Sequence, residues 1–179
     1  MMRARLLGLI ALVLACGLLH AADDCKLNKG FTRLDNGKDL EPFTGKTEGW
    51  AIVDGAVHLD AKKAKGDIFT KATHSDNAVI TMQFRATKGA DSGVHIWGKQ
   101  LQVRDYPNAG PKQYAKPAKP AGEWNYLEFD ITKGVAVVNL NDEVIEKAWK
   151  IGGDKTKGIG LQKERGDFDF RCIQVWEKK

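Results

Sequence analysis

The sequence predicts an all-β protein, an antiparallel sandwich or jelly roll, and three observations lead to this prediction. Short segments with strand-like patterns recur from residue 30 onward, and turn residues separate them. No window shows a helical period beyond a turn or two, which argues against alternating β and α units. Ten or so short strands at this spacing are typical of a sandwich or jelly roll.

The clearest strand covers residues 78–85, where apolar and polar side chains alternate with a period of two. The alternation assigns four residues to the buried face, namely Ala78, Ile80, Met82 and Phe84. The polar residues between them are expected on the other face, so the strand should be half-buried.

Two hairpins are predicted from their turn residues. Asp54-Gly55 joins the segments 50–53 and 56–59, and Asn141-Asp142 joins 135–140 and 143–145. Further strands are expected at 68–70, 94–97, 101–103, 125–131, 159–162 and 168–176.

Residues 107–122 interrupt this rhythm, because they hold four of the five prolines in the chain. Proline fixes φ and lacks an N–H donor, so we expect a long loop here and no strand. Two interpretations are open: a flap over a site, or a surface excursion without function.

The first 22 residues predict a secretory signal peptide, and residues 23–179 a single domain. A basic start is followed by an apolar run, Leu6 to Leu19, and by small residues. Val13-Leu14-Ala15-Cys16 is an imperfect lipobox, so Cys16 either carries a lipid anchor or leaves with the signal. We therefore expect an exported protein, periplasmic or extracellular.

Charge argues against a nucleic-acid partner. The full chain has a formal net charge of +5, and removal of the signal with Arg3 and Arg5 lowers it to +3. Positive and negative residues alternate along the chain, which is typical of a solvated surface and not of a nucleic-acid footprint.

Two cysteines, Cys25 and Cys172, remain near the ends of the domain. In an oxidising compartment they can form a disulfide. The bridge would close a loop of about 150 residues and stabilise the fold by about 5 kcal/mol at most. The alternative is that Cys172 is a buried apolar residue of the last strand.

The common catalytic signatures are absent from the sequence. It contains no Gly-x-Ser-x-Gly, no phosphate loop and no Gly-x-Gly-x-x-Gly after a strand. His58, His74 and His95 are not spaced as zinc ligands. A cysteine nucleophile is not expected, because the compartment would oxidise it.

The remaining candidates for a functional site are polar side chains at strand positions. Gln100, Gln102 and Arg104 share one face of a strand that Asp105 ends, and His95 and Trp97 share a face of the strand before it. Trp124, Tyr126, Glu128 and Asp130 form a second such set, with Glu123 just before it. Amides, carboxylates and aromatic rings on one face suit a sugar, and a solvated sheet face is the alternative.

The order of several motifs resembles a secreted bacterial family, the 3-keto-disaccharide hydrolase domain. The motifs are GFTRLDNGKDL at 30–40, WAIVDG at 50–55, DSGV at 91–94, Tyr114, GEWN at 122–125, GIGLQ at 158–162 and FR at 170–171. The resemblance implies a concanavalin-like jelly-roll sandwich, export, and action on glycosides whose sugar carries a ketone at carbon 3.

The chain departs from the family pattern at the expected site. Family members often have Asn where Asp91 stands, Arg where Trp97 stands, and Glu where Gln100 stands. An amide at position 100 neither takes a proton near neutral pH nor binds a hard cation well. Asp105 or Asp91 would have to take over the role of the missing glutamate. Because both carboxylates are hard oxygen donors, a divalent metal ion remains a possible ligand of the site.

We therefore predict a carbohydrate-active hydrolase or lyase that cleaves 3-keto-glycosides by base-assisted elimination or hydrolysis. The alternatives are a non-catalytic, lectin-like module of the same fold and a lipid-anchored envelope protein with a structural role. Asp105, His95 and Glu123 are the candidate catalytic residues. The candidate sugar contacts are Gln102, Trp97, Tyr114, Gln100, Gln162 and Arg171.

Overall fold

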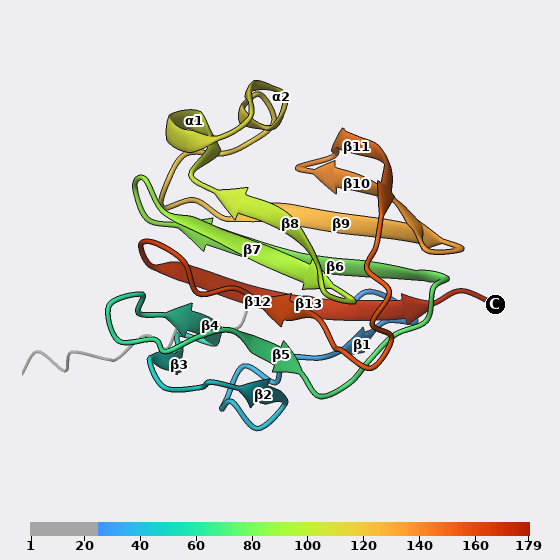
Figure 1. Cartoon of the computed structure of the whole chain (residues 1–179), viewed down its shortest axis with the longest axis horizontal. Coiled ribbons are helices and arrows are strands. Elements are labelled where there is room, and N and C mark those ends of the chain that lie inside the picture. Colours follow the sequence, from blue (N-terminus) through green and yellow to red (C-terminus); the bar gives the residue numbers. More distant parts are fainter. Residues whose placement is uncertain (1–24) are drawn as a thin grey trace, which may run out of the picture.

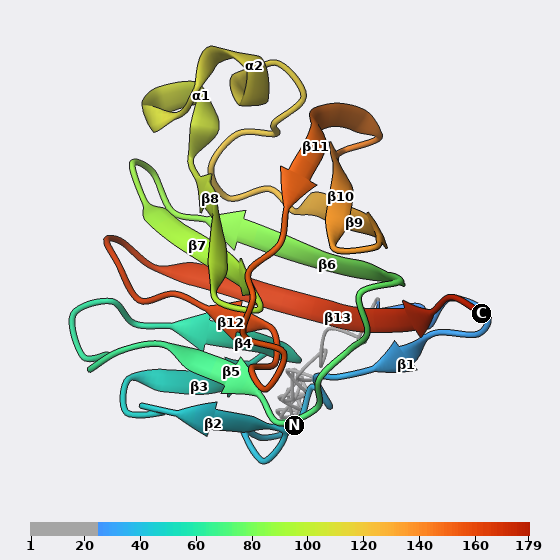
Figure 2. The ribbon, with the colours of Figure 1, turned by 45° about the vertical axis from the view of Figure 1, so that its right-hand side comes forward.

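Two antiparallel sheets packed face to face make up the computed structural model, which describes residues 25–179 (Figures 1 and 2). This is the β-sandwich that the sequence predicted. The predicted signal peptide and Cys16 lie outside the described residues. Within residues 25–179, no helix is long and apolar enough to cross a bilayer.

The larger sheet, called sheet A, has eight strands. Seven run in the order β11-β10-β9-β6-β13-β4-β3, and β1 pairs with β13 beside this path. The strands are β1 (Thr32–Arg33), β3 (Trp50–Val53), β4 (Ala56–Leu59), β6 (Ala78–Ala86), β9 (Asn125–Thr132), β10 (Val135–Leu140), β11 (Glu143–Lys150) and β13 (Phe168–Glu177).

The smaller sheet, called sheet B, has five strands in the order β2-β5-β12-β7-β8. They are β2 (Phe43–Gly45), β5 (Ile68–Thr70), β7 (Asp91–Ile96), β8 (Lys99–Arg104) and β12 (Gly160–Leu161). Strands β7 and β8 form a hairpin at one edge, and this hairpin positions the candidate site described below.

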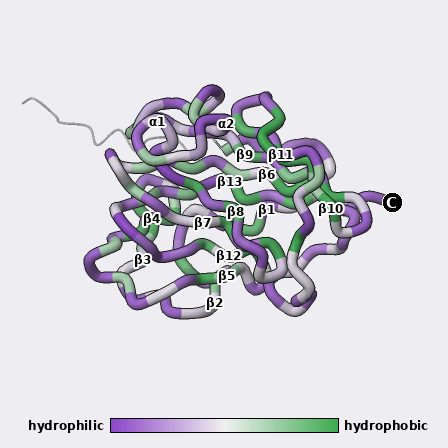
Figure 3. Tube along the Cα trace, turned by 45° about the horizontal axis from the view of Figure 1, so that its top comes forward, coloured by the Kyte–Doolittle hydropathy of each residue, from purple (hydrophilic) through white to green (hydrophobic). Residues whose placement is uncertain are grey.

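One hydrophobic core fills the space between the sheets. The four residues assigned to the buried face of β6 are fully buried there, which confirms the alternation predicted for this strand. Sheet B contributes Ile68, Val94, Ile96, Val103 and Leu161 to the same cluster. Figure 3 shows hydrophilic residues gathered in the loops around the sheets.

Tight turns with left-handed backbone connect the hairpins. Both predicted turns, Asp54-Gly55 and Asn141-Asp142, have positive φ at their two central residues, as a type I′ turn requires. Trp97-Gly98 and Lys133-Gly134 form two more turns with the same backbone.

The segment 107–122 was predicted as a loop, and this is wrong for part of its length. It contains most of helix α1 (Tyr106–Ala109) and all of helix α2 (Lys112–Ala115). Pro107 lies in the first turn of α1 and Pro111 caps α2, positions where proline needs no N–H donor. The prolines therefore begin short helices here. The strands β1 and β2 were not predicted either, because two or three residues carry no detectable period.

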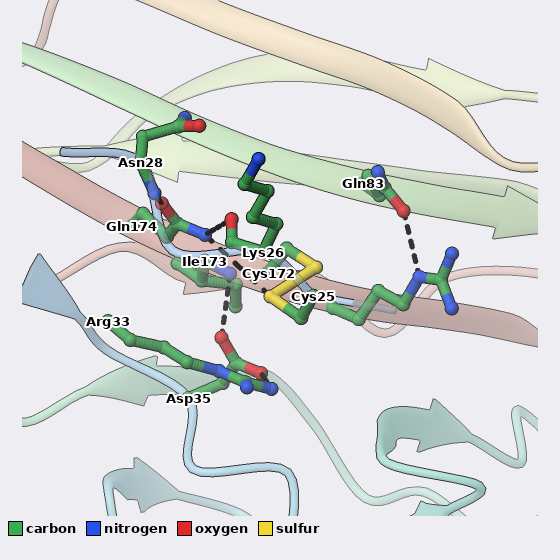
Figure 4. Close-up of a disulfide and its surroundings, with 10 residues drawn as sticks. Cys25, Lys26, Asn28, Arg33, Asp35, Gln83, Cys172, Ile173 and Gln174 are labelled. Carbon is green, nitrogen blue, oxygen red and sulfur yellow. Dashed lines mark hydrogen bonds and ion pairs between the residues drawn. A yellow bond between two sulfur atoms is a disulfide. The ribbon is translucent and has the colours of Figure 1, made fainter. Parts of the chain in front are cut away.

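Strand β13 contains a bulge at its centre. Between Arg171 and Gln174 the register with β6 shifts by one residue, and Cys172 takes a φ of 57°. The bulge takes Cys172 out of the alternation, and the residue is bonded to Cys25 with a Cα–Cα distance of 5.2 Å (Figure 4). The disulfide considered from the sequence is thus present in the structure.

The residues before β2 bind the backbone of this bulge. Oδ1 of Asp35, which is 2% exposed, accepts a hydrogen bond from the N–H of Ile173 at 2.7 Å. The N–H of Leu34 donates to the carbonyl of Ile173 at 2.7 Å. Gln174 holds the segment after Cys25, because its side chain bonds the backbone of Lys26 and Asn28 at 3.0 Å each (Figure 4).

Candidate functional site

The outward side of the β7–β8 hairpin in sheet B carries several of the polar residues singled out from the sequence. Antiparallel register places three pairs of residues opposite one another: Asp91 with Arg104, Gly93 with Gln102, and His95 with Gln100. The residues between them, such as Val94 and Leu101, point into the core. We call this surface, with the adjoining Gln162, Glu164, Asp67 and Phe69, the polar face.

Hydrogen bonds join the side chains of the polar face into one row. The amide nitrogen of Gln100 donates to Oε1 of Gln162 at 2.7 Å and to Oε1 of Gln102 at 3.3 Å. The amide nitrogen of Gln102 donates in turn to Asp91 and, at 3.2 Å, to Glu164. The row therefore presents amide and carboxylate groups that are already positioned by one another.

Arg104 ends the row near helix α1. Its Nη2 lies 3.2 Å from Oδ2 of Asp91, and its Nη1 donates to the carbonyl of Ala109 at 2.6 Å. Both oxygens of Asp91 are thus engaged, one by Gln102 and one by Arg104. Asp91 consequently acts as the anchor of the row.

Gly93 lies beneath this row and leaves room for it. A Cβ atom at this position would lie 2.5 Å from Nε2 of Gln100 and 2.8 Å from Oε1 of Gln162. The glycine of the DSGV motif is thus required for the two glutamines to meet above the strand.

His95 and Phe69 lie at the other end of the polar face. Their ring centroids are 6.1 Å apart, and a Cβ atom on the intervening Gly160 would lie 2.6 Å from Phe69 and 2.8 Å from His95. Nε2 of His95 is buried, has no hydrogen-bond partner in the described chain, and lies 3.7 Å from Oδ2 of Asp67.

The electrostatics of this end favour a neutral imidazole. Burial lowers the pKa of His95 below its ordinary value, and the nearby Asp67 carboxylate and a backbone hydrogen bond at Gly98 only partly oppose this. Near neutral pH the ring is therefore uncharged and can accept a proton, while Asp67 is placed to stabilise the imidazolium that forms. Together the face offers amides, a carboxylate, an aromatic ring and a base.

Asp105, a predicted catalytic residue, does not join the polar face. Its N–H bonds the carbonyl of Ala90, a core residue, and the side chain is 2% exposed. Oδ2 accepts hydrogen bonds from the N–H of Gly89 at 2.8 Å and from Nδ2 of Asn108 at 2.7 Å. These contacts fix the start of α1 and the turn before β7.

Trp97 and Tyr114, predicted to contact a sugar, are 4% and 7% exposed. The prediction that His95 and Trp97 share a strand face is wrong, because β7 ends at Ile96 and Trp97 begins the turn with a φ of 49°. The indole stacks on His74 with centroids 5.3 Å apart.

Tyr114 packs edge-on against Tyr106 at 5.6 Å, and its hydroxyl donates to Glu146. Both aromatic rings are therefore used in packing, Trp97 against His74 and Tyr114 against Tyr106.

Glu123 and Arg171 lie on the other sheet. Glu123 is exposed in the turn before β9. Nε of Arg171 donates to Gln83 at 2.8 Å on the outer face of sheet A. Of the predicted site residues, the structure thus brings together His95, Gln100, Gln102 and Gln162, and separates them from Asp105, Glu123, Trp97, Tyr114 and Arg171.

A metal centre has little support from the geometry of residues 25–179, which contain no group of three His, Cys, Asp or Glu side chains arranged to hold an ion. Asp91 and Asp105, the oxygen donors considered from the sequence, point to opposite sides of sheet B and are both hydrogen-bonded.

Three residues of the polar face were missed in the sequence. Glu164 could have been found, since it follows Gln162 by two positions and strand alternation returns to the same face. Asp67 and Phe69 belong to the short segment around β5, and only the sheet order, which places β12 between β5 and β7, brings them to His95.

Comparisons with known proteins agree with this fold. The model of the 3-keto-alpha-glucoside-1,2-lyase-like domain family matches residues 30–176. A candidate glycosyl hydrolase of Parabacteroides distasonis is 18% identical, with a TM-score of 0.70 over 87% of this chain and 99% of its own. No curated relative matches the sequence.

Two solved structures from Bacillus subtilis have the same kind of fold. A protein with a galectin-like fold is 14% identical, with a TM-score of 0.54 over 82% of this chain and 94% of its own. A carbohydrate-binding module is 10% identical, with a TM-score of 0.52 over 76% of this chain and 96% of its own. At these identities the likeness is one of fold.

Proposed function

Because the chain belongs to the 3-keto-alpha-glucoside-1,2-lyase-like domain family, we propose that it cleaves 3-keto-glycosides on the polar face of sheet B. A carbohydrate-related function follows from the family. The observation that carries the finer proposal is the unpartnered Nε2 of His95, which lies beside Asp67 on the same face as the glutamine row.

The substrate's own ketone makes this chemistry accessible. A carbonyl at carbon 3 acidifies the hydrogen on carbon 2, because the electron pair left behind is delocalised as an enolate. When the enolate collapses, carbon 3 regains its carbonyl, a double bond forms between carbons 1 and 2, and the bond from carbon 1 to the aglycone oxygen breaks. That oxygen takes a proton from the protonated base or from water. In the hydrolytic outcome water then adds across the new double bond, with its hydroxyl on carbon 1 and its hydrogen on carbon 2. No covalent nucleophile is required.

The residues of the polar face match these steps. Nε2 of His95 is buried, so the imidazole has to turn toward the sugar before it takes the proton from carbon 2; Asp67 then stabilises the charge that it acquires. The side-chain oxygens of Gln100 and Gln102 accept hydrogen bonds from the sugar hydroxyls, and the amide nitrogen of Gln102 donates to the enolate oxygen in place of its 3.2 Å bond to Glu164. Phe69 supports an apolar face of the ring. Asp105 contributes indirectly, by holding the turn before β7 and the start of α1.

Release of free sugar from a panel of 3-keto-disaccharides tests the proposal. We expect His95→Gln and Asp67→Asn to lower the rate, His95→Gln on the order of 10²-fold or more, as is typical for loss of a general base. Glu128→Gln is the matched control, since Glu128 lies on sheet A, bonded to Tyr126 and Asn139. Full activity in His95→Gln would refute the assignment of the base.

A second candidate function is sugar binding without turnover, and Gln100 is the observation that favours it. An amide occupies the centre of the row, bonded to Gln162 and Gln102, at a position where it cannot exchange a proton. Titration calorimetry with the same disaccharides separates the two functions. If the disaccharides bind with measurable heat but none of them releases free sugar, the protein is a binding module and the enzymatic function is excluded.

Export completes the proposal. The Cys25–Cys172 disulfide supports an oxidising compartment, because such bridges persist outside the cytosol. Intact mass of the membrane and soluble fractions tests the route. A diacylglyceryl group on Cys16 identifies a lipoprotein, a cut near Ala22 identifies a fully exported domain, and an uncut chain in the cytosol would refute export.

A further inference from the structure

The outer face of sheet A, which the proposed function does not use, carries a second cluster of polar and aromatic side chains. We call it the Trp124 cluster, and its members are His58, Arg85, Trp124, Asp169 and Arg171. Strand register brings the charged members together, since Asp169 of β13 lies opposite His58 of β4 on one side and Arg85 of β6 on the other.

Asp169 is bound from both sides. Its Oδ2 accepts hydrogen bonds from Nε and Nη2 of Arg85 at 2.9 and 2.7 Å, and its Oδ1 lies 2.8 Å from Nδ1 of His58. The charges of Arg85 and Asp169 cancel, while the arginine side chain remains 38% exposed. The pair thus presents N–H donors of Arg85 at the surface while its net charge is zero.

Trp124 lies over this charged surface. The guanidinium carbon of Arg171 is 4.0 Å from the ring centroid, and that of Arg85 is 4.7 Å from it. The two arginines come from neighbouring strands of the same sheet, so the indole extends across β6. Trp124 is only partly buried, so it offers an oriented aromatic surface to a ligand.

A cavity opens beside these residues. Its volume is about 280 Å³, and it is lined by Arg85, Ala86, Thr87, Gly122 and Asp169. The space beside Gly122 is empty, since a Cβ atom placed there would meet no atom within 4 Å. This volume is just below the range of about 300–1,000 Å³ that is usual for ligand pockets, which suits one sugar ring and not an oligosaccharide.

We propose that the Trp124 cluster and this cavity form a second binding site, for a single neutral sugar ring. Arg85, Asp169 and Thr87, which line the cavity, supply hydrogen-bonding groups for its hydroxyls, and the indole of Trp124, which packs on Arg85, borders them. A neutral ligand fits better than an anion, because the only two charged residues lining the cavity are the paired Arg85 and Asp169. The site is on the opposite sheet from the polar face and works independently of it.

Titration of ¹⁵N-labelled protein with glucose, galactose and mannose tests this site. The indole N–H signal of Trp124 is identified by its loss in Trp124→Phe. We expect it to shift with a dissociation constant on the order of millimolar for at least one sugar, the affinity typical of a small, open site.

Variants connect the signal to the cluster. Asp169→Asn removes the negative charge that holds Arg85 and should weaken binding at least tenfold, whereas Glu128→Gln on the same sheet should leave it unchanged. His95→Gln should also leave it unchanged, which separates this site from the proposed function. The proposal is overturned if no sugar shifts the Trp124 signal, if Asp169→Asn binds as tightly as the wild type, or if acetate or phosphate produces the same shift.

Discussion

Removal of the Cys25–Cys172 disulfide should destabilise the fold by several kilocalories per mole. The two cysteines are 147 residues apart in the sequence, so the bridge closes nearly the whole described chain into one loop. The chain-entropy relation for a loop of this length gives about 17 cal/mol/K, or about 5 kcal/mol at 25 °C. For a domain of this size that corresponds to a fall in Tm of roughly 10–20 °C.

Urea denaturation of the Cys25→Ser, Cys172→Ser and double variants measures this loss. Because either substitution opens the same loop, the three variants should lose equal free energy of unfolding, and wild-type protein treated with a reductant should match them. The hydrogen bonds of Gln174 to Lys26 and Asn28 do not depend on the bridge, so the N-terminal segment should remain bound in the native state.

Two results would refute this reasoning. A loss below about 1 kcal/mol in the double variant would mean that the loop contributes little entropy to the unfolded state. A much larger loss for Cys172→Ser than for Cys25→Ser would mean that burial of Cys172, which is 7% exposed, matters more than the bond.

Three further substitutions test other parts of the structure. Asp35→Ala should cost about 2–3 kcal/mol in urea denaturation, because it removes a charged acceptor from a buried backbone N–H, whereas Asp35→Asn, which keeps an acceptor, should cost less. Burial lowers the pKa of His74 and of His95 below the ordinary value of 6.5. The stability that depends on their neutral rings is therefore fully present above pH 6.5 and is lost as the pH falls below 6.5. The urea midpoint should therefore fall between about pH 7.5 and about pH 5, and fall less in His74→Phe; an equal fall in both proteins would contradict this cause. Gly93→Ala should displace the two glutamines above it and weaken binding of the sugar about tenfold or more with little change in Tm, and unchanged binding would show that the row is not the site.

Local patterns in the sequence predicted most of the fold. The alternation at 78–85 assigned the buried face of β6 correctly, because each strand position repeats every second residue. Asp54-Gly55 and Asn141-Asp142 predicted two hairpins, since few other residues adopt their backbone. The strand β2 and the helix α2 could not be predicted in this way, because three or four residues are too few to repeat the period of a strand or a helix twice.

The site was less accessible to sequence reasoning than the fold. Gln100 and Gln102 were found because they alternate along one strand. Asp67 and Asp105 show why the other residues could not be placed from the sequence. Asp67 comes near His95 only because of the order of the strands in sheet B. Asp105 points inward because it follows Arg104, the last outward residue of β8. Trp97 was misassigned because the strand pattern continues in the sequence one residue beyond the point where the backbone turns.

The disulfide also determines what happens when the chain is cut. Any single peptide bond cleaved between Cys25 and Cys172 leaves two fragments that remain joined through sulfur, since both ends of that interval are covalently linked. Only the seven residues after Cys172 on the C-terminal side lie outside this closed ring. A protease that nicks the exposed loop at Gly122 would therefore release no fragment, and the nicked molecule would keep its mass, apart from one added water, until its thiols were reduced.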